Sequence, residues 1–109
     1  MNIDLQIQGH ATRYVLLKLC ARGGRGDYQA FPTVPLGCDV AACGRRLVRL
    51  GVEAPRTNGE RLVFDWRGAK MTMFKSGRIL LEGVAPDRAA TAAEWIETLV
   101  KEALGERRQ

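Results

Sequence analysis

The chain contains few of the side chains on which catalysis and metal binding usually depend. Its 109 residues include a single histidine, His10, and three cysteines, Cys20, Cys38 and Cys43. One histidine cannot form a metal-binding pair or cluster, and the spacing of Cys38 and Cys43 does not fit the usual ligand loops of zinc or iron–sulfur sites. An odd number of cysteines also argues against a disulfide framework in a chain that is not secreted. We therefore expect small apolar thiols, no metal and no cofactor.

Long apolar runs and targeting segments are missing as well. No stretch approaches the ~20 apolar residues that span a bilayer, and no basic segment precedes an apolar one at the N-terminus. No nucleophile, base and orienting group can be assembled from the spacing of the motifs, which argues against an enzyme. We expect a cytoplasmic, non-catalytic protein that makes no contact with membranes.

The composition predicts one folded domain with an uneven charge. Hydrophobic residues make up 46% of the chain and charged residues 27%, which is typical of a globular protein, and the length predicts a single domain over residues 1–109. The net charge is +5, and residues 1–84 hold 13 Lys and Arg against 7 Asp and Glu, while residues 85–109 hold 4 against 5. Such a basic excess suits a polyanionic partner, and it also keeps small proteins soluble without one.

The N-terminal residues predict one strand, followed by a segment that fits two structures. Alternating apolar residues over positions 2–8 predict the strand. Residues 11–21 fit a helix capped by Thr12 and stopped by the glycine pair that follows, or a buried strand centred on residues 14–17. We favour the helix because the alternation ends at Leu17.

Residues 23–37 are rich in glycine and proline, which predicts a loop. They complete the N-terminal portion of the chain. The beginning of this stretch, Arg22–Gly26, has the composition of a phosphate-binding glycine loop. Neither a Gly-Lys-Ser/Thr ending nor an immediate helix start follows it, so its amides would not be aimed at a phosphate. We interpret it as a flexible basic loop.

Residues 38–104 begin with a predicted helix whose outer face is basic. Asp39 is a good N-cap and Gly51 a good C-cap. The residues at helical spacing on its inner face are Val40, Cys43, Gly44, Leu47 and Val48. Arg45, Arg46 and Arg49 project from the opposite face, where they can grip phosphates or simply form a solvated surface.

The rest of this portion predicts an antiparallel meander and a second helix. Asn58-Gly59 predicts a hairpin turn, and strands are expected over residues 61–66, 70–74 and 78–82. Pro86-Asp87 begins the final helix, and its apolar stripe runs as far as Ala103. Residues 105–109 form a tail.

One family resemblance covers about half of the chain, residues 52–104. An apolar strand runs into Ser76-Gly77-Arg78, a second strand follows, and a helix closes the unit. This order resembles one repeat of the TATA-box-binding-protein family, with Phe74 at its second wedge phenylalanine and Asn58-Gly59 at its Pro-Gly. The resemblance implies an α+β fold in which a curved antiparallel sheet carries its helices on one face.

The same resemblance contains departures that argue against the family's activity on DNA. The family uses a phenylalanine pair to pry apart base steps in the minor groove. Thr57 stands at the first wedge position, and Glu82 places a carboxylate where the family has a threonine that touches the groove. The chain also holds one repeat where the DNA-binding form needs two, so only a dimer would rebuild the saddle. We expect the fold to be shared and the activity to differ.

A second, shorter resemblance covers residues 33–78. A helix that ends in Gly51, followed by the stretch Arg61–Asp65, resembles the region after the adenylating core in the ThiF/MoeB family of ubiquitin-like-protein activating enzymes. The nucleotide site and catalytic cysteine of that family have no counterpart in this sequence. This resemblance therefore implies an appended domain of a larger protein rather than the enzyme itself.

Taken together, these patterns favour a binding domain that uses the open face of its sheet. The expected binding residues are Arg61, Lys70, Thr72, Phe74, Lys75 and Arg78. A protein partner or a charged ligand is the first expectation, and nucleic acid is the second. The hypothesis requires Phe74 to lie on the open face, and a Phe74 buried beneath the helices would contradict it.

Overall fold

The computed structural model describes residues 2–6, 13–34 and 37–104 of the chain. The strands are β1 (Asn2–Gln6), β2 (Arg13–Arg22), β3 (Arg25–Pro32), β4 (Arg56–Thr57), β5 (Arg61–Trp66), β6 (Ala69–Phe74) and β7 (Ile79–Val84). The helices are α1 (Val40–Arg49) and α2 (Ala89–Leu99), and the π-helical turn η1 (Val100–Leu104) continues α2. The expectations for His10, for a cap at Thr12 and for the tail 105–109 lie outside the described residues.

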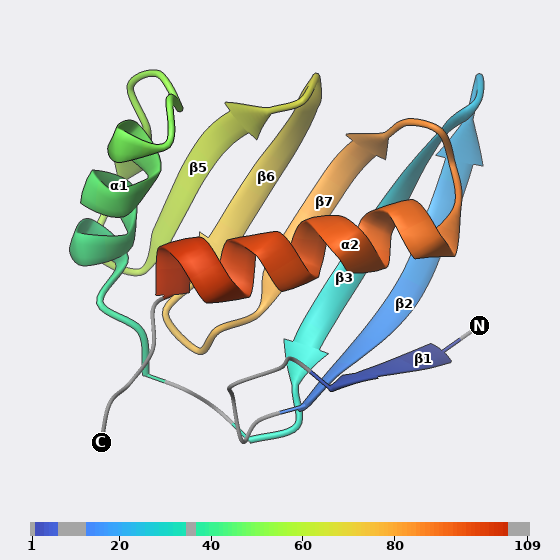
Figure 1. Cartoon of the computed structure of the whole chain (residues 1–109), viewed down its shortest axis with the longest axis horizontal. Helices are drawn as coiled ribbons and strands as arrows, with labels where there is room; N and C mark the ends of the chain where they lie inside the picture. Colours follow the sequence, from blue (N-terminus) through green and yellow to red (C-terminus); the bar gives the residue numbers. More distant parts are fainter. Residues whose placement is uncertain (1, 7–12, 35–36, 105–109) are drawn as a thin grey trace.

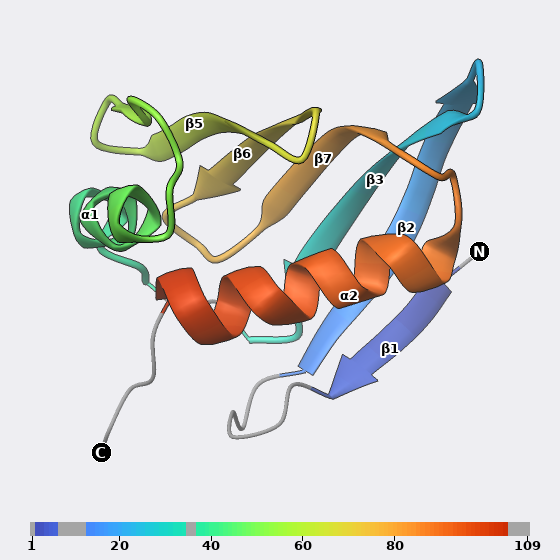
Figure 2. The ribbon, with the colours of Figure 1, turned by 45° about the horizontal axis from the view of Figure 1, so that its top comes forward.

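The seven strands form one antiparallel sheet in the order β1-β2-β3-β7-β6-β5-β4. The chain lays down β1, β2 and β3 side by side, crosses through α1 to the other edge, and returns strand by strand until β7 pairs with β3. Figures 1 and 2 show α2 lying across one face of the sheet, with α1 near β5 on the same side. The predicted class, α+β with an antiparallel sheet, is confirmed. Among the described helices, none has the length and apolar character needed to cross a bilayer.

Two predictions for the N-terminal portion are wrong. Residues 13–22 form β2 rather than the favoured helix, and most of the expected loop is β3, which pairs with β2 on one side and β7 on the other. Gly23 and Gly24 have φ angles of 55° and 80°, as in the two-residue turns that close hairpins. A glycine pair can stop a helix or close a hairpin. Here the pairing of β3 with β2 and with the distant β7 favours the hairpin. The residues proposed as a basic loop are therefore a tight hairpin turn.

The predictions for the meander are confirmed. β5 has the expected bounds, and β6 and β7 differ from theirs by at most two residues. The turn predicted at Asn58-Gly59 joins β4 to β5, with Gly59 at a φ angle of 92°. The side-chain oxygen of Asn58 accepts hydrogen bonds from the backbone N–H groups of Glu60 and Arg61, at 3.1 and 3.2 Å. These bonds fix the entry into β5.

The first helix begins at its predicted cap, Asp39, and its C-cap is Leu50, one residue before the predicted Gly51. Oδ1 of Asp39 accepts a hydrogen bond from the backbone N–H of Ala42 at 3.2 Å, and Gly51, with a φ angle of 97°, follows the last turn. Val48, however, is 56% exposed, so its predicted place on the inner face is wrong. The contact with the sheet is narrower than the sequence pattern indicated, because α1 packs mainly through Val40, Cys43, Gly44 and Leu47.

The core lies between the helices and one face of the sheet. The buried strand residues are Tyr14, Leu16, Tyr28, Ala30, Leu62, Phe64, Met71, Met73, Ile79 and Leu81. The helical residues that cover them include Leu47, Ala92, Trp95, Ile96 and Leu99. Because successive side chains of a strand point to opposite faces, the residues between these lie on the other face of the sheet. No described helix covers that face, which we call the open face.

Asp87 connects the start of α2 to the β2–β3 hairpin. Its carboxylate accepts hydrogen bonds from the Tyr28 hydroxyl at 2.6 Å and from the Lys18 ammonium at 2.9 Å, and its backbone N–H donates to the Gly24 carbonyl at 3.1 Å. Both hydrogen bonds lower the pKa of Asp87, and the bond from Tyr28 has the larger effect. Burial, followed by the bond to Asp87, raises the pKa of Tyr28 to about 12. Because Asp87 is used in this way, α2 begins at Ala89 and not at the predicted Pro86-Asp87.

Candidate functional site

The open face consists of three rows of side chains that run across the sheet. The strand register places Phe31, Phe74 and Arg61 in a basic row, which Arg78 joins from the turn just before β7. It places Leu17, Gln29, Leu80, Thr72, Val63 and Arg56 in a central row, and Asp27, Glu82, Lys70 and Asp65 in an acidic row. Each row takes one residue from every strand that it crosses. With a rise of ~3.4 Å per residue, neighbouring rows are ~7 Å apart.

The basic row is organised around Arg78. Its guanidinium carbon lies 4.0 Å from the ring centroid of Phe74, within the range of a cation–π contact. Its Nη1 also donates a hydrogen bond to Oε1 of Gln29 in the central row. Arg61 is the register partner of Phe74 and is exposed. One half-buried ring therefore has an arginine on each side of it.

The turn that carries this row is held by three other segments. The buried Tyr14 hydroxyl donates to the Gly77 carbonyl at 2.9 Å, and burial raises the pKa of Tyr14, which keeps this donor protonated. The backbone N–H of Cys38 donates to the Lys75 carbonyl at 2.6 Å, and the N–H of Lys75 donates to the Glu60 carbonyl at 3.0 Å. A turn with this many anchors presents Phe74 and Arg78 in a fixed geometry, which lowers the entropy lost on binding.

The central row is mostly apolar. Leu17, Val63 and Leu80 are half-buried, and Thr72 between the last two is only 5% exposed. Because no described helix lies over this face, we attribute the low exposure of Thr72 to the larger side chains beside it, Val63 and Leu80. From Leu17 to Val63 the row carries no charged side chain, and the exposed Arg56 of β4 continues it at the edge of the sheet.

The acidic row carries the opposite charge balance to the basic row. It holds three carboxylates and one ammonium, with Lys70 directly between Glu82 and Asp65 in the register. The carboxylate of Asp27 is engaged within the chain, where it accepts hydrogen bonds from the Gly83 backbone at 3.0 Å and from Arg22 at 3.3 Å. In the described part of the chain, no ion pair involves the side chains of Glu82, Lys70 or Asp65.

The structure brings most of the predicted sheet residues together. Arg61, Lys70, Thr72, Phe74 and Arg78 all lie on the open face, and Lys75 is exposed in the adjoining turn. Lys70, however, belongs to the acidic row and stands ~14 Å along the strand from the basic row. The predicted set is therefore divided between two ends of the face.

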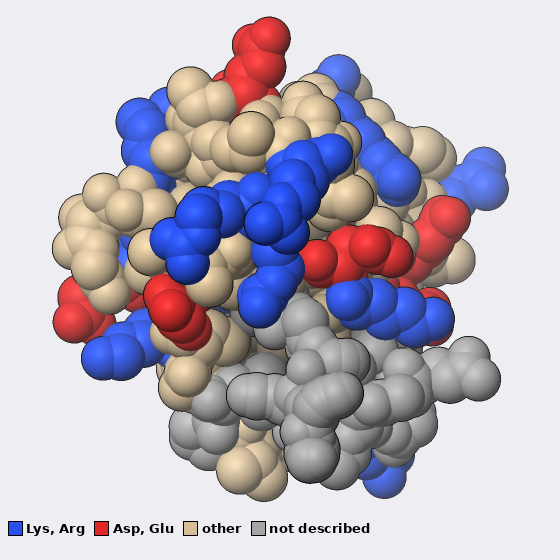
Figure 3. Space-filling model, turned by 60° about the vertical axis from the view of Figure 1, so that its left-hand side comes forward, with Lys and Arg blue, Asp and Glu red and all other residues tan. Residues whose placement is uncertain are grey.

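The three arginines predicted as a group on α1 are not equivalent. Arg45 and Arg49 are exposed, but Arg46 is half-buried and its Nη1 donates to the Ala103 carbonyl at 2.9 Å, which ties α1 to η1. They lie on the helix-covered side of the sheet, away from the open face. Figure 3 shows the side of the molecule that faces left in Figure 1: Lys and Arg side chains gather in its middle, with Asp and Glu side chains next to them.

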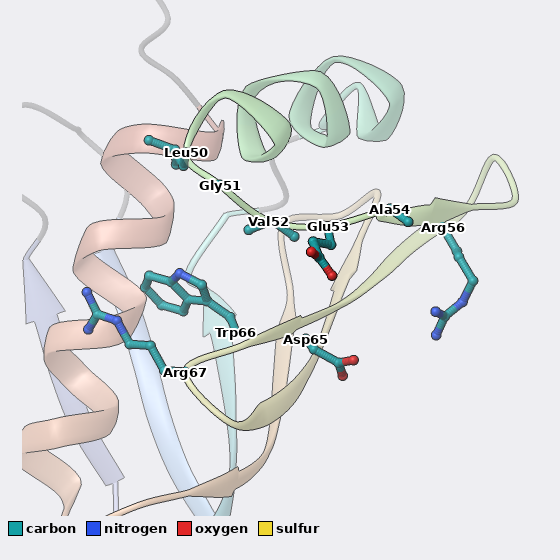
Figure 4. Close-up of a pocket in the computed structure, with 9 residues that line it drawn as sticks. All are labelled: Leu50, Gly51, Val52, Glu53, Ala54, Arg56, Asp65, Trp66 and Arg67. Carbon is teal, nitrogen blue, oxygen red and sulfur yellow. The ribbon is translucent and has the colours of Figure 1, made fainter.

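A pocket of about 360 Å³ lies between the segment after α1 and the end of β5. Figure 4 shows Trp66 and Arg67 on the side of α2, with Asp65 and Arg56 on the other side of the strand. The Arg67 guanidinium carbon is 4.2 Å from the Trp66 ring centroid, and the Trp66 and Trp95 rings meet edge to face at 5.7 Å. The charged residues that line the pocket are all exposed, and the Arg67 guanidinium is already stacked on the Trp66 ring. The pocket lacks the desolvated polar groups that usually orient a small ligand.

The three cysteines differ in their surroundings: Cys20 is exposed, Cys38 is half-buried and Cys43 is buried. Cys43 is buried, as expected, and burial raises the pKa of its thiol. Cys20 is exposed, and its thiol donates to Asp27 at 3.1 Å, a bond that raises its pKa and keeps it protonated. Among the residues in the described ranges, no three His, Cys, Asp or Glu side chains are grouped so as to hold a metal ion.

Most residues of the three rows were absent from the predicted binding set, among them Gln29, Phe31 and Leu80. The first two were missed because β3 was taken for a loop. The alternation of Tyr28 and Ala30 with Asp27, Gln29 and Phe31 is the signal that could have revealed this strand. Trp95 was likewise absent from the predicted stripe of the last helix.

Comparison with protein-family models, curated proteins and solved structures finds no match to this chain.

Proposed function

We propose that this chain is a non-catalytic interaction domain and that its open face binds a protein partner. The observation that carries the proposal is the fixed order of the three rows, in which an apolar strip separates a basic and aromatic end from an acidic end. Protein interfaces combine an apolar centre with a charged and polar rim in this manner. Aromatic and arginine side chains such as Phe74 and Arg78 are also the residue types enriched at such contacts.

The order of elements supports a TATA-box-binding-protein-like unit within this domain. From β3 onward the chain follows the strand–helix–meander–helix order of one such repeat, with α1 between β3 and β4 and α2 after β7. β1 and β2 are additions that extend the sheet beyond β3. We use the likeness only for the arrangement of the elements, since function depends on the site.

The proposal can be tested with small probes that report where ligands collect on the surface. Three probes share a benzene ring and differ in charge: benzoate, benzylammonium and benzyl alcohol. Each is titrated into the isotope-labelled chain at low protein concentration, and amide shifts are followed by NMR. We expect benzoate to shift the amides of Phe74 and Arg78, benzyl alcohol those of Thr72 and Leu80, and benzylammonium those near Glu82.

Two results would count against this assignment. Shifts concentrated around Trp66 and Arg67 would favour the pocket beside β5 as the binding site. Identical shift patterns for the three probes would show that the charge order of the rows does not select ligands. The pocket thus serves as the internal control for the open face.

Nucleic acid is a second candidate, favoured by the net charge of +5 and by the arginine pair around Phe74. A backbone that crossed the whole face would meet Glu82 and Asp65 at the acidic row. Thr57, at the first wedge position of the related family, pairs with the buried Leu62 and so belongs to the helix-covered face, opposite Phe74. We expect no saturable binding of random-sequence DNA or RNA at low salt. Binding that weakens steeply with added salt would favour this candidate instead.

A further inference from the structure

The charge pattern of the open face indicates which kind of partner would fit it. On the proposal that this face is an interaction surface, we infer that it binds the open face of a second copy of the chain in a two-fold symmetric dimer. A self-association surface must be complementary to itself, because both subunits use the same patch. The three rows meet that requirement in one orientation.

The register places opposite charges at equal distances from the central row. On β5, Arg61 and Asp65 lie two residues to either side of Val63. Glu82 on β7 and Arg78, just before that strand, lie two residues to either side of Leu80. On β6, Phe74 and Lys70 lie two residues to either side of Thr72.

A two-fold axis that runs along the central row turns this spacing into contacts between subunits. The axis reverses the strand direction and keeps each strand over its own copy. Arg61 of one subunit then faces Asp65 of the other, Arg78 faces Glu82, and the ring of Phe74 faces the ammonium of Lys70. The uncharged residues of the central rows meet each other, while Arg56, the register partner of Val63, faces its own copy at the edge of the contact. The twist of both sheets allows their strands to cross at ~30°.

The alternative orientation is disfavoured by charge. A two-fold axis along the strands would stack the basic row on the basic row and the acidic row on the acidic row, and like charges across an interface oppose association. A polyanion would meet the acidic row, as described above. Only the orientation with its axis along the central row pairs opposite charges on both β5 and β7.

The size of the face sets the expected strength of the dimer. Five strands at ~4.8 Å spacing and five residues at ~3.4 Å rise give a footprint of roughly 400 Å² in projection. Over both subunits this is about 800 Å², below the ~1,200–2,000 Å² of standard specific interfaces, so the contact is expected to be weak and transient. We therefore expect a dissociation constant in the micromolar range, which weakens as salt screens the charge pairs.

The test is sedimentation equilibrium of the full chain from about 1 µM to about 500 µM, a range that covers weak and moderate dimers. Arg61→Asp and Asp65→Arg each place like charges in two symmetric contacts, and we expect each to weaken dimerisation at least about tenfold. The double variant Arg61→Asp/Asp65→Arg restores opposite charges and should recover most of the affinity. Arg45→Asp, on the helix-covered side, is the matched control and should have no effect.

A wild-type chain that stays monomeric over the whole range would overturn the dimer. A dimer whose affinity is unchanged by either single charge reversal, or not recovered by the double variant, would also overturn it, because the subunits would then associate elsewhere. A monomeric chain whose open face still binds the small probes in order of charge leaves the interaction surface in place with a different protein as its partner. A change in the thermal unfolding of a single variant is separated from the interface effect by the recovery in the double variant.

Discussion

Gly26 and Asp87 approach each other more closely than any residue with a side chain at position 26 would permit. A Cβ atom on Gly26 would overlap the Asp87 carboxyl group, with Cγ at 2.7 Å, and would lie 2.9 Å from Cε1 of Tyr28. This contact lets the first residues of β3 lie directly beneath the start of α2. It joins the β2–β3 hairpin to the segment that leads into α2.

Gly26→Ala should therefore destabilise the fold, by about 1–3 kcal/mol as for other overpacked sites. Gly44→Ala is the matched control, because a Cβ atom there would lie 3.5 Å from Leu62 and alanine is the better helix former. We expect the control to be neutral or slightly stabilising. Urea unfolding of the three proteins checks both values. Equal stability of the wild type and Gly26→Ala would show that Asp87 can move away at no cost.

Alkaline pH should weaken the fold through Tyr28. Its pKa is about 12 in the folded chain and about 10 when unfolded, so the folded state keeps a proton that the unfolded state has lost. The stability from this residue is complete below pH ~10 and is lost as pH rises towards ~12. Tyr28→Phe removes this contribution, although Tyr14, whose pKa is also raised, still contributes. Urea midpoints measured across this range should fall more steeply for the wild type than for the variant.

Acid should weaken the fold through Asp87. Its pKa is lowered in the folded chain by the Tyr28 hydroxyl and the Lys18 ammonium, so its stabilising effect is present above pH ~4 and is lost as pH falls through the lowered pKa. Asp87→Asn should be less stable than the wild type at pH 7, since Lys18 loses its ion pair. The gap between the two proteins should close as the pH is lowered. A constant gap from neutral to acid pH would show that the Asp87 charge has no role.

The meander and the fold class could be predicted because their signals are local. Asn58-Gly59 and Ser76-Gly77 each determine a turn that is found where it was expected, and the apolar stripe determines α2, although this helix begins at Ala89 rather than at Pro86-Asp87. β2 and β3 could not be predicted in this way. The glycine pair between them fits a helix end as well as a hairpin, and β3 is fixed by pairing with β7, some fifty residues along the chain. The part of the open face that β2 and β3 supply, Leu17, Asp27, Gln29 and Phe31, therefore appeared only when that distant pairing was known.

Arg46 should behave as a structural residue although it was predicted as part of a binding group. Arg46→Ala removes the bond to the Ala103 carbonyl and leaves that half-buried oxygen without this donor, which should cost about 1–2 kcal/mol. Arg45→Ala, one position away and exposed, should change stability by less than about 0.5 kcal/mol. Thermal unfolding of both variants measures the difference. Two equal, small losses of stability would show that Arg46 is a surface residue like Arg45 and has no structural role.

The central claim is that the open face is the surface through which this chain binds protein. The most direct measurement is photo-cross-linking in living cells, with p-benzoylphenylalanine placed at Val63 on the open face or at Ala90 on the exposed side of α2. We predict discrete cross-linked species from position 63 and none from position 90, and a product of twice the chain mass would identify the second copy. Cross-links from position 90 alone, or from neither position, would contradict the claim.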